Sequence, residues 1–423
     1  MTQLYNYFLQ SAGVSTDTRN IYPNCIFFAL KGASFDGNTF AIEALKMGAA
    51  YAVVDNNEVA QQDERCILVD NVLKALQDLA RHHRRQFDIP FIGITGSNGK
   101  TTTKELIAAV LTQQYNVHYT KGNLNNHIGV PLTLLQLTKE HEIAVIEMGA
   151  NHFGDIKELC EIAEPTHGII TNIGKAHLEG FLNFEGVLKT KKELYDSIKS
   201  VDGVLFYNDD DQILKDILPT VRQISYGQHQ GTVKGKLEHL TPFVEFTYEH
   251  GAYQSTLLRT HIVGEYNFYN FLASIAIGHF FDVPFEKINA GIEGYIPTNN
   301  RSQVEKTESN TLIVDCYNAN PTSMRAALNS FSKIEANDKI AILGDMRELG
   351  EESTLEHEAI IEQLTELNIN AILVGEEFKK VNTHFTHYDS TQSFIDNHSS
   401  IQNQLVLLKG SRGIGLEKLI PLL

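Results

Sequence analysis

The sequence lacks the features that mark several large classes of protein. Its 423 residues contain four cysteines, no two of which form a CxxC pair. No Lys/Arg run offers the basic face of a general nucleic-acid binder, and the formal net charge is −17. No window holds the ~18 uninterrupted apolar residues of a membrane span, and the start, MTQLYNYFLQSAG, lacks the basic region of a signal peptide. These absences favour a globular cytoplasmic protein whose thiols act as small buried apolar groups.

The length and the hydrophobic pattern predict several α/β domains. At ~100–200 residues each, the chain has room for two to four domains. Short apolar runs alternate with helical patterns, which is typical of mostly parallel sheets. We expect three segments, 1–84, 85–298 and 299–423.

Individual strands and helices are expected within these segments. In the first, the strands are 25–30, 50–54 and 66–69, followed by a helix over 71–86. Its basic end, Arg81–Arg85, reads as a solvated helix end or the start of a linker in preference to a binding patch. In the second, the strands are 91–94, 143–146, 168–170 and 203–206, with a hairpin over 244–258 and a helix over 266–281. In the third, the strands are 312–315, 340–345, 371–375 and 405–410. Ligands gather at the carboxyl ends of such strands.

A glycine-rich loop carries the clearest chemical signal. Thr95-Gly96-Ser97-Asn98-Gly99-Lys100-Thr101-Thr102 follows an apolar strand and precedes a helical run that ends at Leu111. Two glycines let backbone N–H groups turn toward phosphate oxygens, the lysine supplies a charge for the β and γ phosphates, and the Thr101 hydroxyl suits Mg²⁺. The spacing is shorter than the generic G-x-x-x-x-G-K-[ST]. We interpret the loop as an ATP cradle, in preference to a purely structural turn.

Three further groups are candidates for the metal. Glu147 ends the strand Ile143–Ile146, where the alternative is an exposed strand-end carboxylate. His177 follows the strand 168–170, where the alternative is a core or surface histidine. Lys189, Lys191 and Lys192 crowd before Glu193, and the alternative is a solvated helix face.

In this order the pieces resemble the Mur ligase family. The marks are the loop Thr95–Thr102, Asn125-Asn126-His127-Ile128-Gly129-Val130-Pro131, Glu147-Met148-Gly149, and Asn172-Ile173 with His177. Asp315–Met324, Leu343–Gly350 and Lys409–Arg412 look like the member that adds D-alanyl-D-alanine. Asp17-Thr18-Arg19 and Phe35-Asp36-Gly37 resemble its UDP-binding domain.

The resemblance implies a small α/β UDP-binding domain, a central P-loop α/β domain and a C-terminal Rossmann-like α/β domain. It also assigns roles to matching positions. The catalytic set would be Lys100, Lys191, His177, Asn318 and Asn320. ATP would be bound by Gly96, Ser97, Asn98, Gly99, Lys100, Thr101, Thr102, Asn267, Arg301 and Asp345. Two Mg²⁺ ions would be held by Thr101, Glu147, His177 and a carbamylated Lys191. Substrates would be contacted by Asp17, Thr18, Arg19, Asn125, Asn126, Tyr317, Asn318 and Ser323.

Two positions depart from the usual pattern. Lys192 stands where glycine is common, so the carbamylated position rests on the register Thr190-Lys191-Lys192-Glu193. Tyr266 precedes Asn267 where histidine is usual, which bears on base stacking.

The implied activity is ATP-dependent ligation of D-alanyl-D-alanine to a UDP-N-acetylmuramoyl tripeptide through an acyl phosphate, by a monomer. The rival hypotheses are another ligase of the superfamily, such as folylpolyglutamate synthase or the ligase adding the third peptide residue, and a regulator that senses ATP without ligation. The third residue of the acceptor peptide, diaminopimelate or lysine, stays open.

Overall fold

The structure is a computed structural model that describes residues 1–240, 242–336, 338–398 and 400–423. The chain forms two compact units. Unit 1 comprises residues 1–94, 116–150 and 154–167, and unit 2 comprises residues 95–115, 151–153 and 168–423.

The first part of unit 1 is a parallel sheet with the strand order β1-β2-β3-β4. The strands are β1 (Val14–Ser15), β2 (Ile26–Phe28), β3 (Tyr51–Val54) and β4 (Cys66–Leu68). The helices are α1 (Thr2–Gln10), α2 (Ala41–Lys46), α3 (Asn57–Ala60) and α4 (Val72–Arg84). Alternate strand residues, such as Cys25, Phe27 and Ala29, pack with α2 in one core. The three predicted strands and the predicted helix are therefore confirmed, and the two-residue β1 escaped prediction.

The second part of unit 1 has three parallel strands, β5 (Phe91–Thr95), β6 (Val117–Tyr119) and β7 (Ile143–Glu147), with β7 pairing with both of the others. The helices α6 (Gly129–Leu134) and α7 (Asp155–Ala163) pack against α4. Arg84, at the end of α4, is buried and donates to the carbonyls of Ala163 and Glu164, each at 2.9 Å. Its guanidinium also stacks on the Phe91 ring at 3.7 Å. The basic end of α4 thus includes a buried arginine that holds α4 against the end of α7.

The buried His118 and the half-buried His279 make the stability of the chain depend on pH. Burial lowers the pKa of His118 on β6 to about 4, and its Nε2 donates to the Thr133 carbonyl at 2.7 Å. His279 also has its pKa lowered to about 4 by burial. An unfolded histidine has a pKa of about 6.5, so on acidification the unfolded chain takes up a proton before the folded chain does.

We therefore expect stability to fall as the pH drops from about 6.5 toward 4. Between pH 7 and pH 5 the loss from His118 is about 2 kcal/mol. Urea unfolding at both pH values measures it, with His118→Gln expected to flatten the dependence and the exposed-residue control His127→Gln expected to keep it. Equal pH dependence in wild type and His118→Gln would contradict this assignment.

The first part of unit 2 contains α5 (Lys100–Leu111) and a sheet in which the strand order is β8-β9-β10-β11-β12-β13, with β14 beside β12. The strands are β8 (His167–Ile170), β9 (Val204–Asn208), β10 (Arg222–Gly227), β11 (Val233–Leu240), β12 (Phe243–His250), β13 (Tyr253–Gln254) and β14 (Leu258–Val263). The helices are α8 (Leu178–Phe181), α9 (Phe184–Ser200), α10 (Gln212–Asp216), α11 (Phe268–Phe280) and α12 (Phe285–Glu293).

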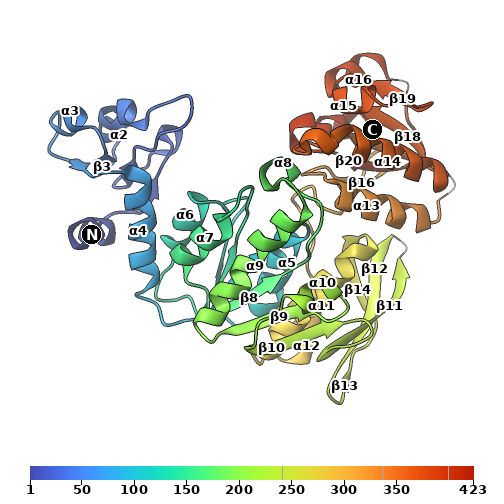
Figure 1. The fold of residues 1–423 in the computed structure, drawn as a ribbon, viewed down its shortest axis with the longest axis horizontal. Coiled ribbons are helices and arrows are strands. Elements are labelled where there is room, and N and C mark those ends of the chain that lie inside the picture. The colour runs from blue at the N-terminus through green and yellow to red at the C-terminus, as the bar shows by residue number, and fades with distance from the viewer. Residues whose placement is uncertain (241, 337, 399) are drawn as a thin grey trace. The chain divides into compact units, whose positions relative to one another are not determined.

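The hairpin expected over 244–258 is only partly right. β12 turns back into β13, but β13 has two residues, and β12 pairs mainly with β11 and β14, all antiparallel. Figure 1 shows these strands beside α11 and α12.

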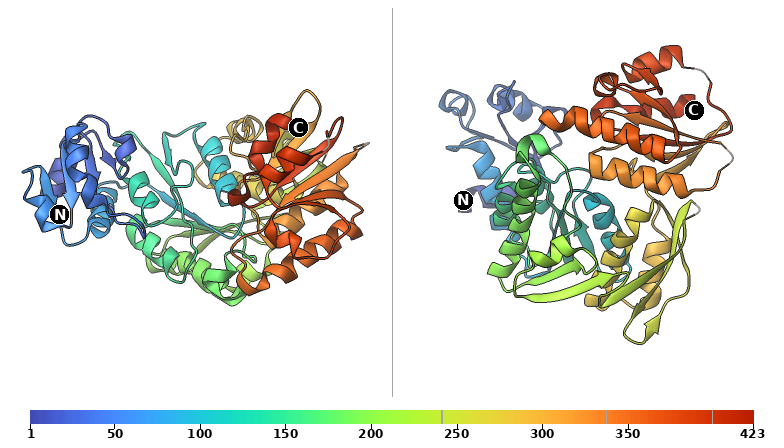
Figure 2. Two further views of the ribbon diagram at one scale, coloured as in Figure 1. Left: turned by 90° about the horizontal axis from the view of Figure 1, so that it is seen from above. Right: turned by 45° about the vertical axis from the view of Figure 1, so that its right-hand side comes forward.

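The last part of unit 2 is a six-stranded sheet with the order β15-β16-β20-β17-β18-β19, seen from further directions in Figure 2. The strands are β15 (Gln303–Lys306), β16 (Thr311–Asp315), β17 (Lys339–Gly344), β18 (Asn370–Val374), β19 (Thr386–Tyr388) and β20 (Leu405–Lys409). Only β15 is antiparallel. The four predicted strands are confirmed as β16, β17, β18 and β20.

Helices cover this six-stranded sheet. They are α13 (Pro321–Lys333), α14 (Ser353–Glu366), α15 (Glu376–Lys379), α16 (Thr391–Asn397) and the 3₁₀ helix η6 (Leu416–Leu422). One core joins alternate strand residues such as Leu312, Val314 and Leu408 to Phe394 of α16 and Leu419 of η6. The helices α13 and α14 pack side by side (Figure 1).

In the described part of the chain, no helix is long and apolar enough to cross a membrane. The four cysteines are free, and burial raises the pKa of the Cys316 thiol to about 12. This matches the expectation of unreactive, buried thiols for Cys316.

Candidate active site

The loop Thr95–Thr102 is held in place by the segment that follows β8. The backbone N–H of Asn98 donates to the Asn172 side chain at 3.0 Å, and Asn172 Nδ2 returns a bond to the Asn98 carbonyl at 3.0 Å. Thr171 Oγ1 donates to the same carbonyl at 2.6 Å. Ser97 Oγ exchanges hydrogen bonds with the backbone of Gly174 at 2.9 and 3.0 Å. The loop is therefore a preorganised structure, as a phosphate cradle requires.

Two glycines set the backbone of this loop. Gly99 has φ +79° and immediately precedes α5, and Gly96 has φ +147°. A Cβ at Gly96 would lie 2.0 Å from Thr171 Oγ1. Lys100, the first residue of α5, donates from Nζ to the carbonyls of Gly96 at 2.6 Å and Ser97 at 3.3 Å. The lysine charge thus lies over the loop, next to the N-terminal N–H groups of α5.

A chain of buried amides and hydroxyls leads away from α5. Thr103 Oγ1 donates to Asn270 Oδ1 at 3.0 Å, and Asn270 Nδ2 donates to Asn267 Oδ1 at 2.8 Å. Asn267 Nδ2 then donates to Ser302 Oγ at 3.0 Å and to the Val263 carbonyl at 2.8 Å. Asn267 is therefore engaged within the protein, and its expected contact with the adenine stays a prediction.

This series of hydrogen bonds continues into the six-stranded sheet. Tyr266 Oη bonds with Ser302 Oγ at 2.9 Å and donates to Asp315 Oδ2 at 3.4 Å. Lys409 Nζ donates to the same carboxylate oxygen at 2.6 Å. Burial raises the pKa of Tyr266 well above its ordinary value, with Asp315 adding to the effect. Tyr266, at the position where the family resemblance leads us to expect histidine, is thus a hydrogen-bonding residue between Ser302 and Asp315.

The start of α13 reaches the phosphate loop. Asn320 Nδ2 donates to Asn98 Oδ1 at 2.7 Å. Asn320 also caps α13, because its Oδ1 accepts from Ser323 N at 2.9 Å while Ser323 Oγ accepts from Asn320 N at 3.1 Å. Both side chains thus have a structural role, and Asn318 is exposed. Arg301 stacks on the Tyr317 ring at 3.8 Å. Contacts of these residues with substrates stay predictions.

Glu147 lies in unit 1, at the end of β7. It is 1% exposed, so it is not the exposed strand-end carboxylate of the alternative reading. Asn125 Nδ2 donates to Glu147 Oε1 at 2.8 Å, and Glu147 N donates to Thr120 Oγ1 at 3.0 Å. Asn126 Oδ1 accepts from the N–H groups of Ile128 and Gly129 and shapes the start of α6. Asn125 therefore orients the carboxylate.

His177 immediately precedes α8 and has a left-handed backbone, with φ +53°. Its Nδ1 lies 2.5 Å from Glu348 Oε2, a residue that follows β17. This contact lowers the pKa of Glu348. The His177 side chain is therefore neither a core histidine nor a free surface histidine.

The lysine cluster on α9 divides into two kinds. Lys191 is 1% exposed, and its Nζ lies 5.6 Å from the centroid of the Phe181 ring. Lys192 is 36% exposed in its side chain and pairs with Asp196. Lys189 is exposed and lies 3.5 Å from Glu185. The solvated-face reading thus holds for Lys189 and Lys192 and fails for Lys191.

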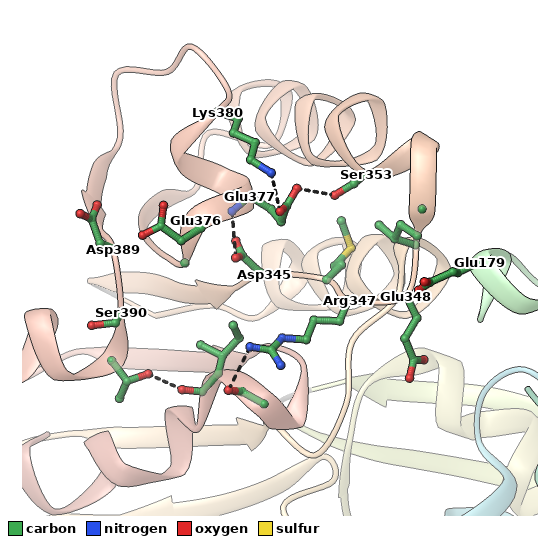
Figure 3. Close-up of a pocket in the computed structure, with 17 residues that line it drawn as sticks. Glu179, Asp345, Arg347, Glu348, Ser353, Glu376, Glu377, Lys380, Asp389 and Ser390 are labelled. Carbon is green, nitrogen blue, oxygen red and sulfur yellow. Dashed lines mark hydrogen bonds and ion pairs between the residues drawn. The ribbon is translucent and has the colours of Figure 1, made fainter. Parts of the chain in front are cut away.

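A cavity of about 780 Å³ lies at the carboxyl ends of β17 and β18. Figure 3 shows Arg347 pointing into it. The Nη2 of Arg347 donates to the Gly413 carbonyl at 3.4 Å. The cavity is otherwise rich in carboxylates, including Glu348 and Asp345. Asp345 caps α15, since its two oxygens accept from the N–H groups of Glu377 at 2.9 Å and Phe378 at 3.0 Å. This structural role accounts for its burial, and its expected role at the nucleotide stays a prediction.

The N-terminal candidates form a local ion pair in unit 1. Asp17 caps the 3₁₀ turn η1 (Thr18–Asn20), and the Arg19 guanidinium beside it lowers the pKa of Asp17 to about 2. Both side chains are solvent-accessible, so Arg19 is available to an anionic ligand.

The described residues hold no group of three or more His, Cys, Asp or Glu side chains placed to bind a metal ion. Mg²⁺, however, commonly binds through one or two protein groups together with substrate phosphates. Thr101 in unit 2 and the buried Glu147 in unit 1 each carry oxygen donors of the kind that Mg²⁺ prefers, and the His177 imidazole in unit 2 is a nitrogen donor that can also bind a metal.

A preorganised phosphate loop at the start of a helix, in an α/β fold, defines a nucleotide-binding enzyme class. Family models match in three stretches: the Mur ligase catalytic domain at residues 10–84, the Mur ligase middle domain at 94–278 and the Mur ligase glutamate ligase domain at 300–412. The chain belongs to the Mur ligase family.

Curated relatives match over nearly the whole length. The UDP-N-acetylmuramoyl-tripeptide–D-alanyl-D-alanine ligase of Bacillus subtilis (strain 168) is 36% identical, with 96% of this chain and 92% of that protein covered. The ligase of that name from Escherichia coli (strain K12) is 33% identical, with 99% and 96% covered.

Solved structures agree with these relatives. MurF from Acinetobacter baumannii matches with a TM-score of 0.88 at 30% identity, covering 99% of this chain and 97% of that one. MurF from Thermotoga maritima in complex with ADP also matches at 0.88, with 26% identity and 98% and 97% covered. The expected three-domain α/β fold is confirmed. The boundaries at 84/85 and 298/299 stay predictions.

Sequence reasoning missed several residues that the structure brings to the site. Lys175 pairs with Glu356 at 2.7 Å and Glu352 at 3.2 Å, and this pairing raises the pKa of Lys175. Asn270 and Glu348 were also missed as functional positions. Lys175 and Glu348 stand inside motifs already recognised, next to His177 and Arg347, but nothing in a single sequence shows that the two motifs meet.

Proposed function

We propose that the chain joins D-alanyl-D-alanine to UDP-N-acetylmuramoyl tripeptide at the expense of ATP, giving the UDP-muramoyl pentapeptide of peptidoglycan synthesis. The observation that carries the proposal is the preorganised loop at Thr95–Thr102, bonded to the N-terminus of α13 through Asn98 and Asn320. Full-length similarity to ligases of that name supports it. An enzyme that uses ATP and a UDP-linked tripeptide would work in the cytoplasm. We also expect the protein to be a monomer.

The reaction must activate a carboxylate. A carboxylate is a poor electrophile, because its charge is delocalised and oxide is a poor leaving group. Transfer of the γ-phosphoryl group to the tripeptide carboxylate gives an acyl phosphate. The amine of the dipeptide then attacks the carbonyl carbon, and phosphate leaves.

The protein mainly positions the reactants and offsets charge. The loop residues Gly96, Ser97, Asn98, Gly99, Thr101 and Thr102 would surround the phosphates, and Lys100 would contact the β and γ oxygens. Arg301, whose Nε has no hydrogen-bond partner among the described residues, has a donor to spare for the nucleotide. Asn267 and Asp345 complete the expected nucleotide set.

Mg²⁺, when bound, would offset the negative charge on the transferred phosphoryl group. Thr101, Glu147 and His177 are the proposed protein ligands; the oxygen donors of Thr101 and Glu147 suit a hard cation held partly by phosphates, and His177 adds a nitrogen donor. Lys191 would contribute as a carbamate, which presents carboxylate-like oxygens. The burial of Lys191, against the exposure of Lys192, favours that register.

The cavity at β17 and β18 is the proposed place of the dipeptide, and Tyr317, Asn318 and Ser323 are further proposed contacts of the substrates. Arg347 extends into this cavity among carboxylates. It therefore supplies a cation for the dipeptide carboxylate, and the surrounding carboxylates suit the ammonium end. Asp17, Thr18, Arg19, Asn125 and Asn126 are the proposed contacts of the UDP-linked substrate.

Arg347→Ala should raise the KM for D-alanyl-D-alanine by about 10- to 100-fold, because a charge-assisted hydrogen bond contributes about 1.5–3 kcal/mol. The KM for ATP should stay near the wild-type value. Steady-state kinetics with each substrate varied measures both, and Lys418→Ala, at an exposed lysine of the same sheet region, is the control. An unchanged dipeptide KM would place the carboxylate elsewhere.

The decisive experiment measures phosphate release from ATP with each substrate omitted in turn. Release should require both the UDP-muramoyl tripeptide and D-alanyl-D-alanine. Turnover without the dipeptide, or with glutamate in its place, would support another ligase of the superfamily. Nucleotide binding without any turnover would support a regulator.

A further inference from the structure

Two strained residues face each other across the candidate active site. His177 and Glu348 are both non-glycine residues with left-handed backbones, at φ +53° and +64°. Their side chains meet at 2.5 Å, between His177 Nδ1 and Glu348 Oε2. Such conformations persist only where the surrounding structure enforces them, and they concentrate at functional sites.

Further contacts hold the two backbones together. The N–H of Glu179, in α8, donates to the Glu348 carbonyl at 3.2 Å. Gly350 lies against Glu179, so that a Cβ there would be 3.8 Å from the Glu179 Cα. Lys175 N donates to Thr322 Oγ1 at 3.1 Å. The segment around His177 is thus docked onto the start of α13 and the loop that follows β17.

The chemistry of this pair is directional. A carboxylate can only accept, so a neutral His177 that bonds to Glu348 carries its proton on Nδ1 and keeps the Nε2 lone pair for another partner. Histidines that bind metals characteristically give their other ring N–H to a carboxylate or carbonyl, which fixes the tautomer and the ring orientation. Glu348 belongs to the six-stranded sheet region, whereas His177 precedes α8.

We propose that Glu348 is a positioning residue that holds His177 in its metal-binding tautomer, so that metal affinity depends on the docking of the six-stranded sheet region onto α8. This rests on the proposed role of His177 as a Mg²⁺ ligand. Domain docking then prepares the metal site without any direct contact between Glu348 and the metal.

The test is Mn²⁺ binding to the full-length protein in the presence of a non-hydrolysable ATP analogue, followed by electron paramagnetic resonance. Glu348→Ala should weaken Mn²⁺ binding about 10-fold or more, and Glu348→Gln should weaken it less. Binding of the analogue without metal should not change. The matched control is Glu351→Gln, at an exposed glutamate three residues along the same loop.

Glu348→Gly separates this role from a folding role. Glycine tolerates the left-handed backbone, so the thermal midpoint should rise or stay level while Mn²⁺ affinity falls. Wild-type Mn²⁺ affinity in Glu348→Ala and Glu348→Gly overturns the proposal. So does a raised dipeptide KM with unchanged Mn²⁺ affinity, because Glu348 would then be an amine-binding group. The Mn²⁺-binding assay contains no UDP-muramoyl tripeptide, so its outcome does not depend on the ligase function. An absence of dipeptide-dependent turnover in the wild-type protein would refute that function separately.

Discussion

Lys100→Ala should lower kcat by about 10³-fold, a loss of about 4 kcal/mol in transition-state stabilisation. The lysine begins α5, and its Nζ is held over the loop by the carbonyls of Gly96 and Ser97. That placement brings a fixed cation to the phosphates without reorganisation during the reaction. Removing it leaves the charge developing on the phosphoryl group without this partner.

The measurement is dipeptide-dependent phosphate release at saturating ATP. Lys139→Ala, at an exposed lysine before β7, should keep wild-type turnover. Circular dichroism and thermal melting check that Lys100→Ala still folds. A kcat within a few-fold of wild type would refute the role of Lys100.

Lys191→Ala should also abolish most turnover, by about 10²-fold or more, because the proposed carbamate oxygen ligand would be lost. The side chain of Lys191 is buried on α9, and its Nζ lies 5.6 Å from the centroid of the Phe181 ring. The proposed carbamate would replace the ammonium of this side chain by an anion that a metal cation can balance.

A small carboxylic acid added to Lys191→Ala should restore part of the activity, since it can supply the missing oxygens. The controls are Lys192→Ala and Lys189→Ala, which lie on exposed positions of the same helix and should keep wild-type turnover. Rescue of Lys192→Ala, with Lys191→Ala silent, would show that the carbamylated position is Lys192.

The sequence predicts those parts of the fold in which the local pattern decides the structure. The apolar runs at 312–315, 340–345, 371–375 and 405–410 became the parallel strands of one sheet, because buried parallel strands are continuous apolar segments. The loop at 95–102 was recognisable because its glycines and lysine have a fixed spacing.

The remaining strands could not be predicted in the same way. β11, with alternating buried and exposed residues and four charged or imidazole side chains, is stabilised by its long antiparallel pairing with β12. Strand formation of this kind depends on packing against neighbouring strands more than on the strand's own residues, so it leaves little trace in a single sequence. The hairpin expected over 244–258 is only partly right for this reason, since β12 pairs mainly with β11 and β14 and only briefly with β13.

The candidate site shows the same difference between features that local sequence determines and features that packing determines. Lysine, threonine and glycine of the loop were identified from spacing, but the partner of His177 lies 171 positions away, at Glu348. The burial that distinguishes Lys191 from Lys192 follows from which face of α9 packs inward. Asn320 was expected to be a catalytic group and Ser323 a substrate contact, whereas their visible bonds form a helix cap.

Gly96 illustrates how such a motif is constrained. The glycine at this place in a phosphate loop is usually explained by the close approach of the phosphates. Here a methyl group at Gly96 would also collide with Thr171, in the segment that follows β8. Two selective pressures therefore act on one position, and only one of them concerns the ligand. A homologue that had lost its ATP chemistry would still need this glycine for as long as it kept a threonine at position 171. The glycine alone is therefore evidence of close packing as much as of catalysis.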